Sequence, residues 1–205
     1  MPYPAAHRVQ VKEKIIDSAR KLFNRHGFDN VSVSQIMAGA GLTHGGCYSY
    51  FKSKSDLYAE VLDCFFTNPN WKNCWEGIKV DRLSPDVGAQ VVRAYLSRQH
   101  YESVEDSCPM VALPSDVTRS NKTVKRTFEA VFQAMVRALE NSMPHNGRQR
   151  HITAQATAAM CVGGMIVARA MAGRGLADQL RDDCMAVALH LGGWNKGVSR
   201  KSPKN

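Results

Sequence analysis

A tight glycine turn between two helix-start signals constrains this chain more than any other feature. Ser32 and Gln35 have the spacing of a capping box, and Val31 and Ile36 have the spacing of a hydrophobic staple. Gly41 suits the left-handed conformation that closes a helix. Thr43 can cap a second helix over residues 44–50. Two short helices around such a turn predict a helix-turn-helix, whose second helix enters the DNA major groove.

Helix signals also flank this turn on both sides. Apolar residues recur at helical spacing over 7–26, and Gly27 followed by Phe28 predicts a Schellman closure. A third helix opens at Ser53, with Asp56 three residues later. The helix over 7–26 and the two helices of the turn together predict a three-helix head, which the helix opening at Ser53 follows.

The order of these residues resembles the tetracycline-repressor (TetR) family over residues 11–65. The resemblance rests on Ile36, the Ala40–Thr43 turn, Gly45, Tyr48, Phe51 and the stretch 54–57. It implies an all-α fold of about nine helices, with a helix-turn-helix head and a larger helical ligand and dimerisation domain. We place the DNA-binding domain at residues 1–66, the effector-binding and dimerisation domain at 67–194, and a disordered basic tail at 195–205.

The second helix of the turn supplies the predicted DNA contacts. His44 and Tyr48 share its outward face, and Gly45 and Gly46 would let the backbone approach DNA closely, unless they merely start a helix that tolerates glycine. The resemblance adds phosphate contacts from Tyr50 and Lys54, although Lys54 could equally be a solvated surface charge. The predicted DNA-binding residues are Ser32, Ser34, Thr43, His44, Gly45, Gly46, Tyr48, Tyr50 and Lys54.

Two positions depart from the family pattern. A hydroxyl residue commonly stands where this chain has Gly46, and a larger aliphatic residue where it has Cys47. Direct base contacts are therefore expected to be fewer. Tyr48, Ser34 and DNA shape should carry more of the recognition.

The rest of the chain predicts further helices over 85–101, 110–119, 121–143, 150–172 and 176–192. The helix over 150–172 is rich in small residues, and the resemblance implies that the last two helices form a four-helix homodimer interface. Residues 152–168 carry no charge, but a membrane span needs about 20 mainly apolar residues. Thr153, Gln155 and Thr157 interrupt this stretch, so we predict a buried helix and no membrane.

Several residues could bind an effector or simply form the core. Trp71 and Trp75 lie four residues apart, and Phe128 and Phe132 share the apolar face of their helix. Cys108 precedes Pro109 and Met110, which resembles a subgroup that senses electrophiles through cysteine. No basic neighbour in the sequence favours a reactive thiolate there, so a structural cysteine is the alternative.

Charge and cysteine content are compatible with a DNA-binding protein without identifying one. The 205 residues carry 27 basic and 18 acidic side chains, but residues 1–66 have a net charge of only +2, and residues 144–205 carry +6. The six cysteines include no C-x-x-C pair, and no secretory signal opens the chain. We therefore expect reduced thiols in the cytoplasm, with no metal site and no cofactor.

These features favour a homodimeric transcriptional regulator, in the first place a repressor, that binds a near-palindromic operator. A small molecule bound in the C-terminal domain would release it from the DNA. One alternative is a helical scaffold protein without specific DNA binding. Another is a thiol-dependent enzyme that uses Cys108 and His100. The sequence contains no catalytic triad order, no H-E-x-x-H motif and no glycine-rich phosphate loop, so an enzyme is not expected.

Overall fold

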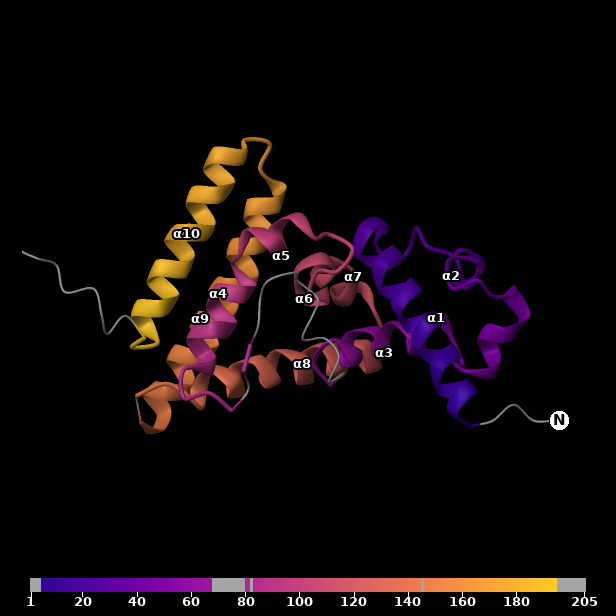
Figure 1. The fold of residues 1–205 in the computed structure, drawn as a ribbon, viewed down its shortest axis with the longest axis horizontal. Helices are drawn as coiled ribbons and strands as arrows, with labels where there is room; N and C mark the ends of the chain where they lie inside the picture. Colours follow the sequence, from indigo (N-terminus) through magenta and orange to yellow (C-terminus); the bar gives the residue numbers. More distant parts are fainter. Residues whose placement is uncertain (1–4, 68–79, 82, 145, 195–205) are drawn as a thin grey trace, which may run out of the picture. The chain divides into compact units, whose positions relative to one another are not determined.

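The computed structural model describes residues 5–67, 80–81, 83–144 and 146–194, and it confirms the all-α prediction (Figure 1). These residues form ten α-helices and one 3-10 helix, where about nine helices were predicted. The elements are α1 Ala5–His26, α2 Val33–Gly39, η1 His44–Ser49, α3 Lys54–Thr67, α4 Val87–Tyr95, α5 Arg98–Glu102, α6 Pro109–Ala112, α7 Pro114–Arg119, α8 Lys122–Glu140, α9 Gly147–Ala170 and α10 Arg174–Leu191.

Two predicted helices are each broken into two. The helix expected over 85–101 stops at Leu96, where the Ser97 hydroxyl donates to the Ala94 carbonyl at 2.8 Å. Such a local bond competes with continuation of the helix. The helix expected over 110–119 breaks at Leu113, because Pro114 lacks an N–H and disfavours helical geometry in the residue before it.

The chain forms two compact units, of which the first comprises residues 1–78 and 98–134. Its core is built around Phe23, Phe28 and Tyr58, whose ring centroids lie 4.8–5.5 Å apart. The same core contains Leu113, which follows the last residue of α6, and Val117, which lies within α7. Tyr58 of α3 thus shares its core with Leu113, which lies 55 residues further along the chain.

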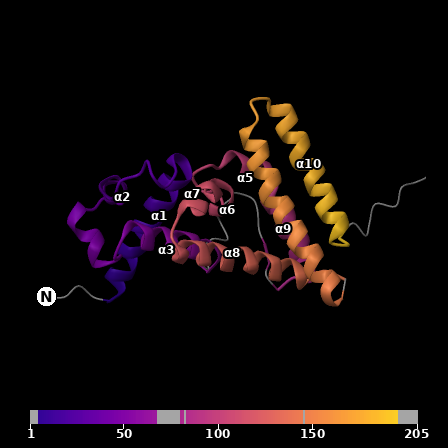
Figure 2. The ribbon, with the colours of Figure 1, turned by 180° about the vertical axis from the view of Figure 1, so that it is seen from behind.

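The second unit comprises residues 79–97 and 135–205, and α9 and α10 lie side by side within it (Figures 1 and 2). Their close approach depends on Gly164, because a Cβ atom there would lie 2.9 Å from the Cys184 Sγ. Arg181 of α10 is buried and donates to the Leu96 carbonyl at 2.8 Å, which ties α10 to the end of α4.

Helix α9 is long and apolar enough to cross a membrane, but 44% of its most apolar window is buried within the structure. The buried face packs against α4 and α10 and includes Ala154, Ala158 and Cys161. The opposite face is exposed, with Ile152 and Val167 47% and 48% accessible. The helix is therefore buried on one side only.

Some predicted features lie outside the described residues. These are Trp71, Trp75, most of the segment that separates the two predicted domains, and the tail 195–205.

Candidate nucleic-acid interface

Helix α2 begins and ends as the sequence predicts. The Ser32 hydroxyl accepts a hydrogen bond from the Gln35 N–H at 3.2 Å, and the Gln35 side chain accepts one from the Ser32 N–H at 2.7 Å. At the other end Gly41 has φ +72°, and the Leu42 N–H donates to the Met37 carbonyl at 2.9 Å. This is a Schellman closure, which fixes the direction of the chain into the next element.

Helix α1 supports α2 at very short range. The Ser18 hydroxyl donates to the Ile36 carbonyl at 2.8 Å, and a Cβ atom on Gly39 would lie 2.5 Å from the Ser18 Oγ. A side chain at residue 39 would therefore displace the Ser18 hydroxyl from its bond to α2, which favours glycine at this position. The orientation of α2 is therefore set by α1.

The element predicted as a reading helix is the six-residue 3-10 helix η1. Its characteristic bonds include Gly46 N–H to the Thr43 carbonyl at 3.2 Å and Tyr50 N–H to the Cys47 carbonyl at 2.9 Å. Two adjacent glycines lower the preference for an α-helix by about 1 kcal/mol each, which accounts for the difference. Thr43 occupies the N-cap position, but its side chain makes no capping bond.

The two faces of η1 agree with the predicted orientation. Cys47 is buried, and burial raises the pKa of its thiol, as expected for a packing residue. On the opposite face, Tyr48 is 59% exposed, and a Cβ atom added at Gly45 would meet no other atom within 4 Å. Ser32, Ser34 and Thr43 are exposed too. His44 begins η1, and its side chain is not among the described parts.

Arg8 is a contributor that sequence reasoning missed. Its guanidinium donates to the Ser49 carbonyl at 2.9 Å and lies 5.6 Å from the centre of the Tyr50 ring. It therefore holds the end of η1 against the start of α1. Arg8 is 41 residues from Ser49 in sequence, and no local pattern indicates this contact.

Lys54 lies at the start of α3, where the Ser53 hydroxyl accepts a bond from the Asp56 N–H at 3.1 Å, as predicted. The Lys54 ammonium is 4.2 Å from the centre of the Phe28 ring. Burial lowers its pKa, and the carboxylates of Asp29 and Asp116 oppose that shift. The side chain is thus partly buried, unlike a freely solvated surface charge.

The predicted effector residues that the structure describes lie in the first unit. Cys108 is fully buried at the N-terminus of α6, and its N–H donates to His100 Nε2 at 3.2 Å. Phe128 packs against the core of the first unit, and Phe132 is half-buried on the same helix, α8. Within the described residues, no group of three or more His, Cys, Asp or Glu side chains could hold a metal ion.

Comparison with known proteins agrees with this arrangement. Residues 15–61 match the family described as bacterial regulatory proteins, tetR family. The HTH-type transcriptional regulator AcrR of Shigella flexneri is 36% identical over 59 residues, which cover 29% of this chain and 27% of AcrR. The chain therefore matches less than a third of that relative's length.

Solved structures of similar fold cover most of the chain. The reduced form of E. coli NemR has a TM-score of 0.68 at 14% identity, over 88% of this chain and 96% of NemR. A complex of SmeT with triclosan has a TM-score of 0.59 at 22% identity, over 88% of this chain and 90% of SmeT. At these identities the similarity establishes the fold.

Proposed function

The chain belongs to the tetR family of bacterial regulatory proteins through residues 15–61, and we propose that it is a ligand-responsive transcriptional repressor that binds a near-palindromic operator as a homodimer. Family membership makes it a transcription regulator and not an enzyme. The observation that carries the proposal is the capped α2, its Schellman turn and the exposed Tyr48 of η1, all supported by α1. Such a regulator works in the cytoplasm.

We assign two kinds of DNA contact. Tyr48, with His44 and Ser34, reads base edges, while Gly45 and Gly46 let the η1 backbone approach the duplex. Ser32, Thr43, Tyr50 and Lys54 contact phosphates, which position a protein on DNA without reading its sequence. The exposure of Ser32, Ser34, Thr43 and Tyr48 supports this assignment.

The exposed face of α9 supports a homodimer through α9 and α10. Small and apolar side chains recur at helical spacing along this face, and Gly163 has open space where a Cβ would stand. The residues of this α9 stripe are Ile152, Ala156, Ala159, Gly163 and Val167. On α10, Leu176 and Val187 are also exposed. A second copy of the chain would bury both surfaces.

The effector is proposed to be a hydrophobic or aromatic small molecule bound in the domain after residue 67. Trp71, Trp75, Phe128 and Phe132 are its proposed contacts. The SmeT structure is a complex with triclosan, an aromatic compound, which supports this ligand class by analogy. Such a ligand acts by favouring a conformation that binds operator poorly, so its effect is limited by its differential affinity for the two states. Cys108 is fully buried, and this supports a structural role.

Fluorescence anisotropy with DNA from upstream of the chain's own gene tests the proposal, measured across a salt series against a scrambled duplex. We expect preferential binding of the upstream DNA at an even number of subunits per duplex, with affinity that falls steeply as salt rises. Tyr48→Ala should reduce the preference between the two duplexes. A folded dimer that binds neither duplex at low salt would refute the proposal and favour the scaffold alternative.

A further inference from the structure

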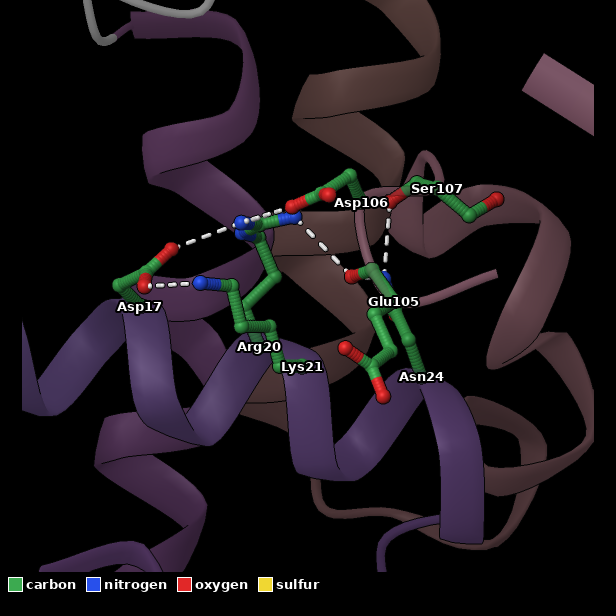
Figure 3. Close-up of polar contacts among 7 residues, drawn as sticks. All are labelled: Asp17, Arg20, Lys21, Asn24, Glu105, Asp106 and Ser107. Atoms are coloured by element: carbon green, nitrogen blue, oxygen red, sulfur yellow. Dashed lines mark hydrogen bonds and ion pairs between the residues drawn. The ribbon is translucent and has the colours of Figure 1, made fainter. Parts of the chain in front are cut away.

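Side chains of α1 hold residues 103–107, which lie between α5 and α6 and which we call the clamp loop. Figure 3 shows two of these side chains, Arg20 and Asn24, with their partners in the loop. Arg20 donates to the Glu105 carbonyl at 3.0 Å and pairs with the Asp106 carboxylate at 2.7 Å. The Asn24 amide donates to the Glu105 carbonyl at 3.0 Å and to the Ser107 carbonyl at 2.8 Å. Arg25 pairs with the Glu105 carboxylate at 2.7 Å.

Two of the three α1 side chains, Arg20 and Asn24, are largely protected from solvent, whereas Arg25 and its partner Glu105 form an exposed pair, with side chains 63% and 46% accessible. Asn24 is 8% exposed, and the Arg20 side chain is 14% exposed. Arg20 also pairs with Asp17 on its own helix at 2.7 Å, so its guanidinium is held from two sides. Burial opposes ionisation of Asp17, yet the hydrogen bonds from Lys21 and Arg20 outweigh that effect and lower its pKa. Asp17 is therefore held in its charged form beside Arg20.

His100 of α5 also holds the clamp loop at Ser107, where the loop meets α6. The His100 Nε2 lies 3.0 Å from the Ser107 hydroxyl and accepts the Cys108 N–H at 3.2 Å, and all three residues are fully buried. The loop thus connects the buried end of α5 directly to α1.

Helix α1 connects in turn to both elements of the candidate DNA-binding surface. Ser18 bonds to α2 and Arg8 bonds to the end of η1. A change in the position of α1 therefore changes the position of both elements. Because Arg20 and Asn24 lie on the same helix, the state of the clamp loop bears on α2 and η1.

We propose that Arg20 and Asn24 are positioning residues for operator recognition, and that the conformation of the clamp loop controls operator affinity through them. The proposal rests on the function proposed above. It assigns to α1 a regulatory connection in addition to its supporting role. A ligand or modification that displaces residues 103–107 would release α1 and weaken operator binding without touching DNA.

The chain offers a closely matched pair of variants for the test. Arg20→Met and Lys21→Met each remove one positive charge and one bond to Asp17, but only Arg20 contacts the clamp loop. Arg20→Met should lower operator affinity about tenfold more than Lys21→Met, because only Arg20→Met loses the charged bonds to Glu105 and Asp106 of the clamp loop. Affinity for scrambled DNA should change equally in both variants.

A second pair uses amide-to-carboxylate changes. Asn24→Asp places an acceptor against two carbonyl oxygens, whereas Asn30→Asp alters an exposed residue whose amide donates only to the nearby His26 carbonyl. We expect Asn24→Asp alone to lose operator preference. Equal operator affinities within each pair, with only the melting temperature reduced, would overturn the proposal and leave the clamp a purely structural contact.

Hydrogen exchange separates failure of this inference from failure of the proposed function. In Arg20→Met, amides of residues 33–49 should exchange faster than in Lys21→Met, whether or not an operator has been found. Unchanged protection of these amides would overturn the inference even in a protein that binds DNA. Faster exchange together with an absence of operator binding by the unmodified protein would sustain the link between clamp loop and head, and refute the proposed function.

Discussion

Lys54 shows how one side chain can serve both the core and the proposed DNA contact. Its ammonium covers the Phe28 ring, and its pKa is lowered chiefly by burial. The same position at the start of α3 is where backbone N–H groups favour a phosphate. A phosphate there would compete with the nearby Asp29 and Asp116 carboxylates for this charge.

Lys54→Met keeps the apolar stem over Phe28 and removes the charge. We expect affinity for operator and scrambled DNA to fall by a similar factor, and the slope of log affinity against log salt to decrease by about 1. Lys125→Met, which removes an exposed charge on α8, serves as the control. An unchanged salt slope in Lys54→Met would show that Lys54 does not contact phosphate.

Cys161 gives the structure a dependence on alkaline pH. Burial, with a smaller effect of the Cys184 thiol, raises the pKa of Cys161 from its ordinary 9.0 to about 12. A raised pKa in the folded state favours the protonated form. Its stabilising contribution is therefore complete below pH 9 and is lost as the pH rises from 9 toward 12.

Urea unfolding at several pH values should reveal this titration. The free energy of unfolding of the unmodified protein should fall more steeply above pH 9 than that of Cys161→Ala, which lacks the titrating thiol. Cys184→Ala is the control, since its partly exposed thiol is less strongly shifted. Parallel curves for the unmodified protein and Cys161→Ala would contradict the assignment.

At the scale of elements, the packing of α9 on α10 depends on the absence of a Cβ atom at Gly164. Gly164 and Gly163 are adjacent in sequence, but a Cβ on Gly164 would press on Cys184, while one on Gly163 would meet open space within the subunit. Overpacking of a tight contact typically costs about 1–3 kcal/mol.

Gly164→Ala should therefore lower the free energy of unfolding by about 1–3 kcal/mol. Gly175→Ala, at a glycine of α10 where an added Cβ meets nothing within 4 Å, should leave it unchanged or raise it by up to about 1 kcal/mol through better helix propensity. Urea unfolding followed by far-ultraviolet circular dichroism measures both. Equal stability of the two variants would show that Cys184 can move aside without cost.

The features that were best predicted from the sequence are those formed by residues close together in the chain. The Ser32–Gln35 capping box, the Gly41 closure and the contact between Phe23 and Phe28 after Gly27 were all predictable, because each depends on spacings of a few residues. Pro114 is a local signal for the break at Leu113, because proline disfavours helical geometry in the residue before it.

Long-range contacts of the site were not predictable in this way. Arg8 reaches Ser49 across 41 residues, and Asn24 reaches Ser107 across 83. Arg and Asn are common on exposed helix faces, and nothing near them in sequence indicates a partner. The shift from an α-helix to the 3-10 helix η1 was only partly indicated, by the two adjacent glycines.

For the whole molecule, the dimer proposal makes the exposed α9 stripe the decisive surface. Val167→Glu would place a charge at the C-terminal end of the α9 stripe, within the proposed interface, where an unpaired charge is costly. Analytical ultracentrifugation should show dissociation to monomers at concentrations at which the unmodified chain is dimeric. Val9→Glu, at a 57% exposed apolar residue of α1, should leave the association unchanged. A dimeric Val167→Glu would place the interface elsewhere.

The shared core of residues 1–78 and 98–134 also sets a rule for recombining this protein with its relatives. A chimera that exchanged only residues 1–66 would place Arg20 and Asn24 against a clamp loop from a different protein. Phe23 and Tyr58 would likewise share a core with residues of that protein in place of Leu113. Such a hybrid would carry the donor's DNA contacts on a mismatched support. For building biosensors from parts, the exchangeable module is therefore two stretches of chain, which should be transplanted together.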